Sequence, residues 1–362
     1  LNIDGSLSSR KGVDQYNSTL TGGARVTSLY GAKKADASAS ALIVTTLAKI
    51  YKDNGAGGWT DITGTTAPPS NTLWMWRMFN NRVIGVNGTS VPQKYEFGAA
   101  CADLTGTPPD KCSIIETSKG RVLLAGDGDA PTAIHGCAAG NSQDWTTASD
   151  AFTIFVDKDN GKAITGIGKL FTKKIILKRK GVYELLDPDG SVANMGIDQI
   201  FDDIGCISPY TVKQIGNDLA WLDDDGVYAL RATQEFGDVA YSAITKKIQT
   251  YIDDIQLSYL PYAYAEDCRK LSQYRVSVPK TAATTNNHVL VRNYYHGAWL
   301  RREGIPFACY GTWEIGGILY NMAGGYDGKV YKLDTLDDDE GANFTKKVSS
   351  KRFTHGTPYR KR

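Results

Sequence analysis

Short apolar runs recur along the chain, and Gly, Asn or Asp residues border most of them. Runs with such borders predict buried β-strands rather than helices. They occupy residues 41–44, 82–85, 121–124, 174–177, 218–221, 274–278 and 317–320. A second set of strand-like segments precedes them, at residues 25–29, 73–79, 113–117, 163–170, 210–215, 262–268 and 307–314. The pattern therefore predicts an all-β protein built from regularly spaced strand pairs.

A tyrosine follows several of these pairs at a similar position. The five tyrosines are Tyr51, Tyr95, Tyr183, Tyr228 and Tyr331. The first two are 44 residues apart, and Tyr183 and Tyr228 are 45 residues apart. The two wider gaps each leave room for one more copy, near residues 134–135 and 289–291. This spacing predicts seven repeats of about 47 residues.

Each repeat thus supplies three strands, and polar segments such as residues 59–62 and 144–147 supply a fourth in some repeats. Four strands in such a repeat are typical of a β-propeller blade, whose faces are covered by its neighbours. We predict one propeller over residues 20–345 with about seven four-stranded blades, six or eight being the alternatives. A β-sandwich is the competing fold, but its strands do not recur in fours.

Two segments depart from the repeat. Ile244, Ile248, Ile252 and Ile255 have helical spacing, which predicts one short surface helix near residues 240–255. Residues 1–19 are expected to form an N-terminal extension or a strand that closes the ring, because an unclosed ring leaves two bare sheet edges.

Composition excludes several classes of protein. The 362 residues include 41 Lys and Arg and 39 Asp and Glu, so the net charge of +2 does not indicate a general polyanion binder. Hydrophobic residues make up 41% of the chain, which excludes wholesale disorder. Apolar runs are too short to span a membrane, and we predict no membrane insertion.

Residue types that form catalytic and metal sites are present, but not in known patterns. The six cysteines lack zinc-site spacing, and the four histidines form no HExxH or HxH motif. No nucleophile elbow or phosphate-binding loop occurs. We predict no catalytic residue, no metal site and no cofactor. The cysteines are expected to be buried thiols, with a Cys101–Cys112 pair as the alternative in an oxidising environment.

Two further features have both a functional and a structural interpretation. Residues 157–161 (DKDNG) resemble the first half of a calcium loop, but the distal Glu is missing and a hairpin turn explains the same residues. The seven tryptophans suit stacking on sugars, but their repeat-like positions favour packing between blades. Acidic clusters such as residues 223–225 are typical of turns rather than of a glycosidase centre.

The C-terminal residues 346–362 are strongly basic. No acidic residue follows Glu340, while the segment contains Lys346, Lys347, Lys351, Arg352, Arg360, Lys361 and Arg362. A surface past which DNA slides should not bind phosphates at many points. We therefore predict that these seven cations dock on a neighbouring protein or lead into a further segment, a solvated end being the structural alternative.

Several motifs resemble those of propeller-bearing virion proteins of tailed bacteriophages. The motifs are residues 9–16 (SRKGVDQY), 74–84 (WMWRMFNNRVI), 141–145 (NSQDW), 204–208 (IGCIS), 226–228 (GVY) and 243–248 (AITKKI). Their order along most of the chain is most similar to the tail hub or nozzle proteins of short-tailed phages. Those proteins commonly carry a second β-domain or a tube-forming insertion, which we do not find in this sequence.

The resemblance implies a non-enzymatic structural component of the virion tail, assembled in the cytoplasm of the bacterial host. The implied partners are further copies of the chain in a ring, usually a hexamer, together with adaptor, portal or other tail proteins. Tail fibres or spikes attach around such rings, and DNA passes through them without specific binding. A carbohydrate-binding propeller is the alternative function, followed by a propeller hydrolase.

Overall fold

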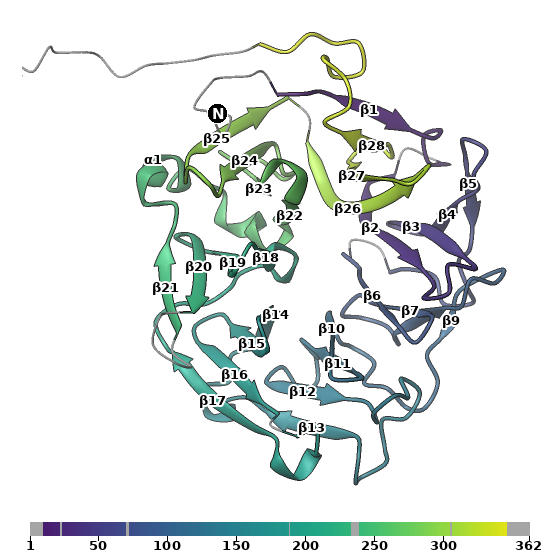
Figure 1. The fold of residues 1–362 in the computed structure, drawn as a ribbon, viewed down its shortest axis with the longest axis vertical. Helices are drawn as coiled ribbons and strands as arrows, with labels where there is room; N and C mark the ends of the chain where they lie inside the picture. The colour runs from purple at the N-terminus through teal and green to yellow at the C-terminus, as the bar shows by residue number, and fades with distance from the viewer. Residues whose placement is uncertain are drawn as a thin grey trace, which may run out of the picture.

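The computed structural model describes residues 10–21, 24–69, 72–187, 189–232, 239–304 and 306–345. They form seven four-stranded antiparallel sheets arranged around a common axis (Figure 1). The protein is therefore a seven-bladed β-propeller, and the predicted fold class and blade number are confirmed.

The blades follow the chain in order, starting with the sheet that contains β2. Blade 1 contains β2 (Val26–Lys33), β3 (Ser40–Thr46), β4 (Ile50–Asp53) and β5 (Trp59–Asp61). Blade 2 contains β6 (Met75–Phe79), β7 (Arg82–Val86), β8 (Gln93–Tyr95) and β9 (Ala102–Asp103). Blade 3 contains β10 (Ile114–Ser118), β11 (Arg121–Ala125), β12 (Ala133–Gly136) and β13 (Phe152–Phe155). Blade 4 contains β14 (Ile164–Leu170), β15 (Lys173–Lys178), β16 (Val182–Leu186) and β17 (Gly196–Phe201).

The remaining three blades complete the circle. Blade 5 contains β18 (Lys213–Ile215), β19 (Asp218–Asp223), β20 (Gly226–Ala232) and β21 (Val239–Ala243). Blade 6 contains β22 (Tyr264–Cys268), β23 (Gln273–Val278), β24 (His288–Asn293) and β25 (Trp299–Glu303). Blade 7 joins β26 (Phe307–Ile315), β27 (Ile318–Gly325) and β28 (Val330–Leu333) to β1 (Val13–Tyr16).

Burial falls from the inner to the outer strands of a blade. The second strands are almost wholly buried, as β3 and β11 illustrate, because neighbouring blades cover both of their faces. The fourth strands β5 and β17 have no fully buried position. The two inferred repeat copies, near residues 134–135 and 289–291, lie in the third strands β12 and β24, where the spacing placed them.

The recurrent tyrosines lie in third strands and are at most 9% exposed. In three blades the hydroxyl donates a hydrogen bond of 2.7–2.8 Å to an aspartate. The pairs are Tyr183–Asp157, Tyr228–Asp225 and Tyr331–Asp327. The repeated tyrosine therefore combines core packing with fixation of an acidic turn.

The predicted helix is present but shorter than the isoleucine spacing suggested. Residues 239–243 form β21, because they pair with β20 at the edge of blade 5. Helical structure is confined to η5 (Lys246–Ile248) and α1 (Gln249–Ile252). Other short 3₁₀ turns are η2 (Lys158–Asn160), η3 (Val192–Asn194), η4 (Pro209–Thr211), η6 (Leu257–Tyr262) and η7 (Arg269–Leu271).

The expected strand at residues 144–147 is wrong. The Asp144 carboxylate accepts hydrogen bonds from the backbone N–H groups of Thr146 and Thr147, which fixes a turn. The fourth strand of this blade is β13, several residues further on, where Phe152–Phe155 pairs with β12. The local side-chain bonds of Asp144 therefore prevailed over the alternating pattern.

Ring closure joins the two ends of the described chain. Strand β1 pairs antiparallel with β28, with Val13 opposite Leu333 and Tyr16 opposite Val330 (Figure 1). Lys332 forms an ion pair of 2.6 Å with Asp14 in the same register. Because β1 covers the free edge of β28, blade 7 contains strands from both ends of the propeller.

We predict that Val13→Asp destabilises the whole propeller, by at least about 3 kcal/mol, because it buries an unpaired charge in the closing strand. Val13 is 3% exposed, whereas Asp14 on the opposite face of the strand is partly exposed. Denaturant unfolding measures the difference, and Asp14→Asn is the matched control, with an expected change below about 1 kcal/mol. Equal stability of the two variants would show that β1 does not hold the ring closed.

Candidate functional site on the propeller axis

The inner strands bring charged side chains from several blades close together. Arg77 on β6 forms an ion pair of 3.1 Å with Glu116 on β10. Lys213 on β18 lies close enough to both for their charges to affect its pKa. Strands β6, β10 and β18 are the inner strands of their blades and line the central axis (Figure 1), so these charges act on one another across the axis although blades 2 and 5 are not neighbours.

Burial and neighbouring charges set the protonation of this cluster. Burial lowers the pKa of Lys213 to about 8, and the Arg77 cation contributes to the decrease. Burial raises the pKa of Glu116, but Arg77 and Lys174 outweigh it, so the net shift is downward. The ammonium group of Lys174 also donates a hydrogen bond of 2.9 Å to the carbonyl oxygen of Thr117. The axis therefore holds a carboxylate surrounded by cations.

A second charged group lies between blades 6 and 7. Arg275, which is 1% exposed, pairs with Glu266 at 3.0 Å and with Asp334 at 2.7 Å. Arg302 also lies 3.5 Å from Asp334. Burial raises the pKa of Glu266 to about 7 despite the neighbouring arginine. These two carboxylates and two guanidinium groups neutralise one another, as buried charges must.

Aromatic side chains fill the end of the axis from which the inner strands start. The hydroxyl of Tyr210 donates a hydrogen bond of 3.3 Å to the carbonyl oxygen of Leu73, which connects blades 5 and 2. The ring of Tyr210 stacks on Tyr264 at 5.2 Å. Arg25 lies over the ring of Tyr326 at 4.7 Å. Contacts between opposite blades therefore cross the axis at this level.

This arrangement resembles a structural core more than a hydrolytic centre. A glycosidase needs a carboxylic acid and a second carboxylate that face the substrate. Glu116, Glu266 and Asp334 instead each contact an arginine. The absence of catalytic activity stays a prediction.

The calcium-like loop is occupied by a lysine of the protein itself. The ammonium group of Lys178 donates hydrogen bonds to the carbonyl oxygens of Val156 and Asp157 and to Oδ1 of Asn160, at 2.6–3.0 Å. These oxygens are of the type that calcium prefers. The structure therefore favours the turn interpretation for residues 157–161.

The acidic turn at Asp223, Asp224 and Asp225 is also neutralised internally. Arg179 and Lys180 lie 3.3–3.6 Å from the carboxylates of Asp223 and Asp224. The backbone N–H of Gly205 donates a further hydrogen bond of 3.0 Å to Asp223. The cations come from the neighbouring blade, so this cluster joins blades 4 and 5.

The remaining candidates from the sequence have structural positions or lie beyond the described chain. None of the seven tryptophans is exposed, and Trp74, Trp76 and Trp221 are at most 2% exposed, which favours blade packing over sugar stacking. All six cysteines are buried and free, so Cys101 and Cys112 are not paired. The proposed docking residues lie outside the described residues: Lys346, Lys347, Lys351, Arg352, Arg360, Lys361 and Arg362.

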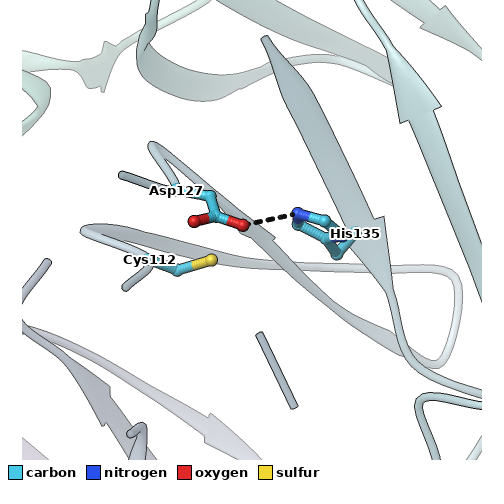
Figure 2. A group of neighbouring side chains, drawn as sticks. All are labelled: Cys112, Asp127 and His135. Carbon is cyan, nitrogen blue, oxygen red and sulfur yellow. Dashed lines mark ion pairs between the residues drawn. The ribbon is translucent and has the colours of Figure 1, made fainter. Parts of the chain in front are cut away.

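One cluster has no signal in the sequence. Cys112, Asp127 and His135 come together in blade 3, although 14 and 7 residues separate them along the chain. Their ligand atoms lie within 4.8 Å of one another (Figure 2). No short motif spans them, because they come from a loop before β10, a loop after β11 and strand β12.

Comparisons with known proteins support the β-propeller fold and identify no function. No family model matches the chain, and no curated protein matches it. Streptogramin B lyase is similar in structure, with a TM-score of 0.55 and 8% identity, covering 90% of this chain and 97% of that one. YCF48 from Cyanidioschyzon merolae gives a TM-score of 0.54 and 10% identity, covering 89% of this chain and 98% of that one. The WD40 propeller domain of Doa1 gives 0.51 and 11%, covering 89% and 97%.

These similarities place the chain in the class of β-propeller proteins. They do not indicate an activity, because the three neighbours are different kinds of protein and are at most 11% identical to this chain. Within the described part of the chain, none of the helices has the length and apolar character needed to cross a bilayer.

We predict that Lys213→Met stabilises the protein relative to wild type at about pH 7, and that the gain shrinks toward about pH 10. The pKa of Lys213 is lowered to about 8 in the folded state, so the fold disfavours its charged form. That penalty is complete below the folded pKa and disappears as pH rises toward the unfolded value. Urea unfolding at both pH values measures the difference, with exposed Lys246→Met as the control. A gain that does not depend on pH would refute this electrostatic explanation.

Proposed function

We propose that the protein is a non-enzymatic structural component of a phage tail, in which copies of the propeller assemble side by side into a ring. The observation that carries the proposal is the uneven distribution of exposed hydrophobic side chains around the propeller. Eleven large hydrophobic side chains of the described residues are exposed, and none of them lies in blades 1, 2 or 5. The order of the phage-like sequence motifs supports the same function.

Two surfaces on different blades contain most of these side chains. The first, the blade 3–4 surface, comprises Phe155, Phe171 and Leu186. The second, the blade 6–7 surface, is defined by Leu300, Ile318 and Leu319, which are 46–64% exposed, and Leu319 lies at its border with Gly31 and Lys33 of blade 1. Strands β13 and β17 lie at the bottom of the view in Figure 1, whereas β25 to β28 lie at the top.

Two different hydrophobic surfaces on opposite sides of one chain suit a head-to-tail contact. Such a heterologous contact forms a ring when the rotation between copies closes. Exposed apolar surfaces of this kind mark interaction sites in folded proteins. We therefore assign the blade 6–7 surface of one copy to the blade 3–4 surface of the next copy.

The other expected partners follow from this arrangement and remain part of the proposal. DNA would pass through the ring of copies rather than along the axis of one propeller, where Tyr210 contacts Leu73. The basic residues 346–362 are proposed to dock on an adaptor, portal or other tail protein. A carbohydrate-binding function is less well supported, because it calls for exposed aromatic side chains at equivalent positions of many blades.

We predict that Leu319→Glu and Phe155→Glu each convert the ring into monomers, because each places a charge in the apolar contact between copies. Native mass spectrometry and electron microscopy measure the assembly. Leu257→Glu is the matched control, because Leu257 is 56% exposed but lies on η6, outside both surfaces. Rings formed by this control should match those of the wild type.

Mixing the two variants tests the head-to-tail geometry directly. The Leu319→Glu variant keeps an intact blade 3–4 surface, and the Phe155→Glu variant keeps an intact blade 6–7 surface. One copy of each variant can therefore form a single contact, so the mixture should contain heterodimers and no larger assembly. A wild-type protein that is monomeric at high concentration, or that saturably binds glycans as a monomer, would overturn the proposed function.

A further inference from the structure

The cluster in blade 3 presents three different metal-ligating atoms to one point. Cys112 is fully buried, and Asp127 and His135 are 7% and 9% exposed. Figure 2 shows the sulfur of Cys112 and the carboxylate of Asp127 on the side of the His135 ring that carries Nε2. The three side chains come from three separate segments, so the fold alone brings them together.

The contact between His135 and Asp127 is an ion pair that is poorly aligned for a hydrogen bond. Nε2 of His135 lies 3.2 Å from Oδ2 of Asp127, and this buried nitrogen has no well-aligned hydrogen-bond partner among the described residues. Two ligands of a tetrahedral zinc ion, each at about 2.0–2.2 Å from the metal, lie about 3.3–3.6 Å apart. The observed separation is close to this range, so a small outward shift of either side chain lets the two atoms share a metal ion.

Neighbouring groups orient both ligands from behind. Nδ1 of His135 lies 2.9 Å from the hydroxyl of Thr153, which can accept its proton and leave the Nε2 lone pair directed at the cluster. Oδ1 of Asp127 accepts a hydrogen bond of 2.9 Å from the backbone N–H of Asp129. Oδ2 is thus the oxygen left facing His135.

The cluster also differs from the two acidic turns at residues 157–161 and 223–225. Lys178 fills the loop at residues 157–161, and Arg179 and Lys180 neutralise the turn at residues 223–225. In blade 3 the adjacent cation, Lys111, pairs instead with Asp129 at 2.9 Å. No lysine or arginine of the described chain forms an ion pair with Asp127.

We propose that Cys112, Asp127 and His135 bind a divalent transition metal of the zinc type. Sulfur, nitrogen and oxygen ligands in one site suit Zn²⁺, and a water molecule can take the fourth position. The ion joins the loop that precedes β10 to the β11–β12 turn. Its role is structural, since it fixes two loops at one end of blade 3.

Metal analysis and spectroscopy of the full chain test this site. We expect about one Zn²⁺ per chain after purification with zinc, and a sulfur-to-metal charge-transfer band after replacement by Co²⁺. Cys112→Ser should abolish the band, and His135→Gln and Asp127→Asn should weaken Co²⁺ binding more than about tenfold. Cys137→Ser is the matched control, because Cys137 is a buried thiol of the same blade outside the cluster.

Two further measurements test metal binding even if a ligand variant folds poorly. Thr153→Val leaves all three ligands in place and should weaken Co²⁺ binding, by about tenfold, through loss of the contact to Nδ1. X-ray absorption of the zinc-loaded wild type should detect one sulfur neighbour among nitrogen and oxygen neighbours. Absence of stoichiometric metal, or a charge-transfer band that survives Cys112→Ser, would overturn the proposal without affecting the proposed ring assembly.

Discussion

The pairing of β1 with β28 is the contact on which the rest of the propeller depends. Each blade is covered on both faces only because it has two neighbours, so an open circle would expose the faces and edges of its first and last blades. Residues 13–16 supply the fourth strand of a sheet whose other strands lie some 300 residues later in the sequence. Closure therefore ties the stability of all seven blades to one short strand at the start of the chain.

Within the closed propeller, charged side chains of neighbouring blades form ion pairs. Arg77 and Glu116 join blades 2 and 3, while Arg179 and Asp223 join blades 4 and 5. Such pairs add little net stability, because the carboxylates lose hydration and the partly exposed arginines are screened by solvent. They do specify which blade lies beside which, since a shifted neighbour would leave a buried charge unpaired. The cluster of Cys112, Asp127 and His135 is the exception that calls for an external cation.

Much of the fold was predictable because a propeller repeats one local pattern. The second strands are apolar because they are buried on both faces, and the recurrent tyrosines are buried beside them. Burial of this kind requires apolar or aromatic residues, so it is visible in the sequence. The predictions were wrong where short-range side-chain bonds decided the outcome. Asp144 fixed a turn in a segment with strand-like alternation, and pairing with β20 drew residues 239–243 out of the expected helix.

The sequence by itself determined the all-β class, the number of repeats and the order of the strands, because these follow from hydrophobic periodicity along the chain. Only the tertiary structure decided which distant residues meet. Tyr210 contacts Leu73 across the axis, and His135 on β12 comes close to Cys112 in the loop before β10. Such contacts depend on where the ring closes and how each sheet twists, and neither property leaves a fixed spacing between residues in the sequence.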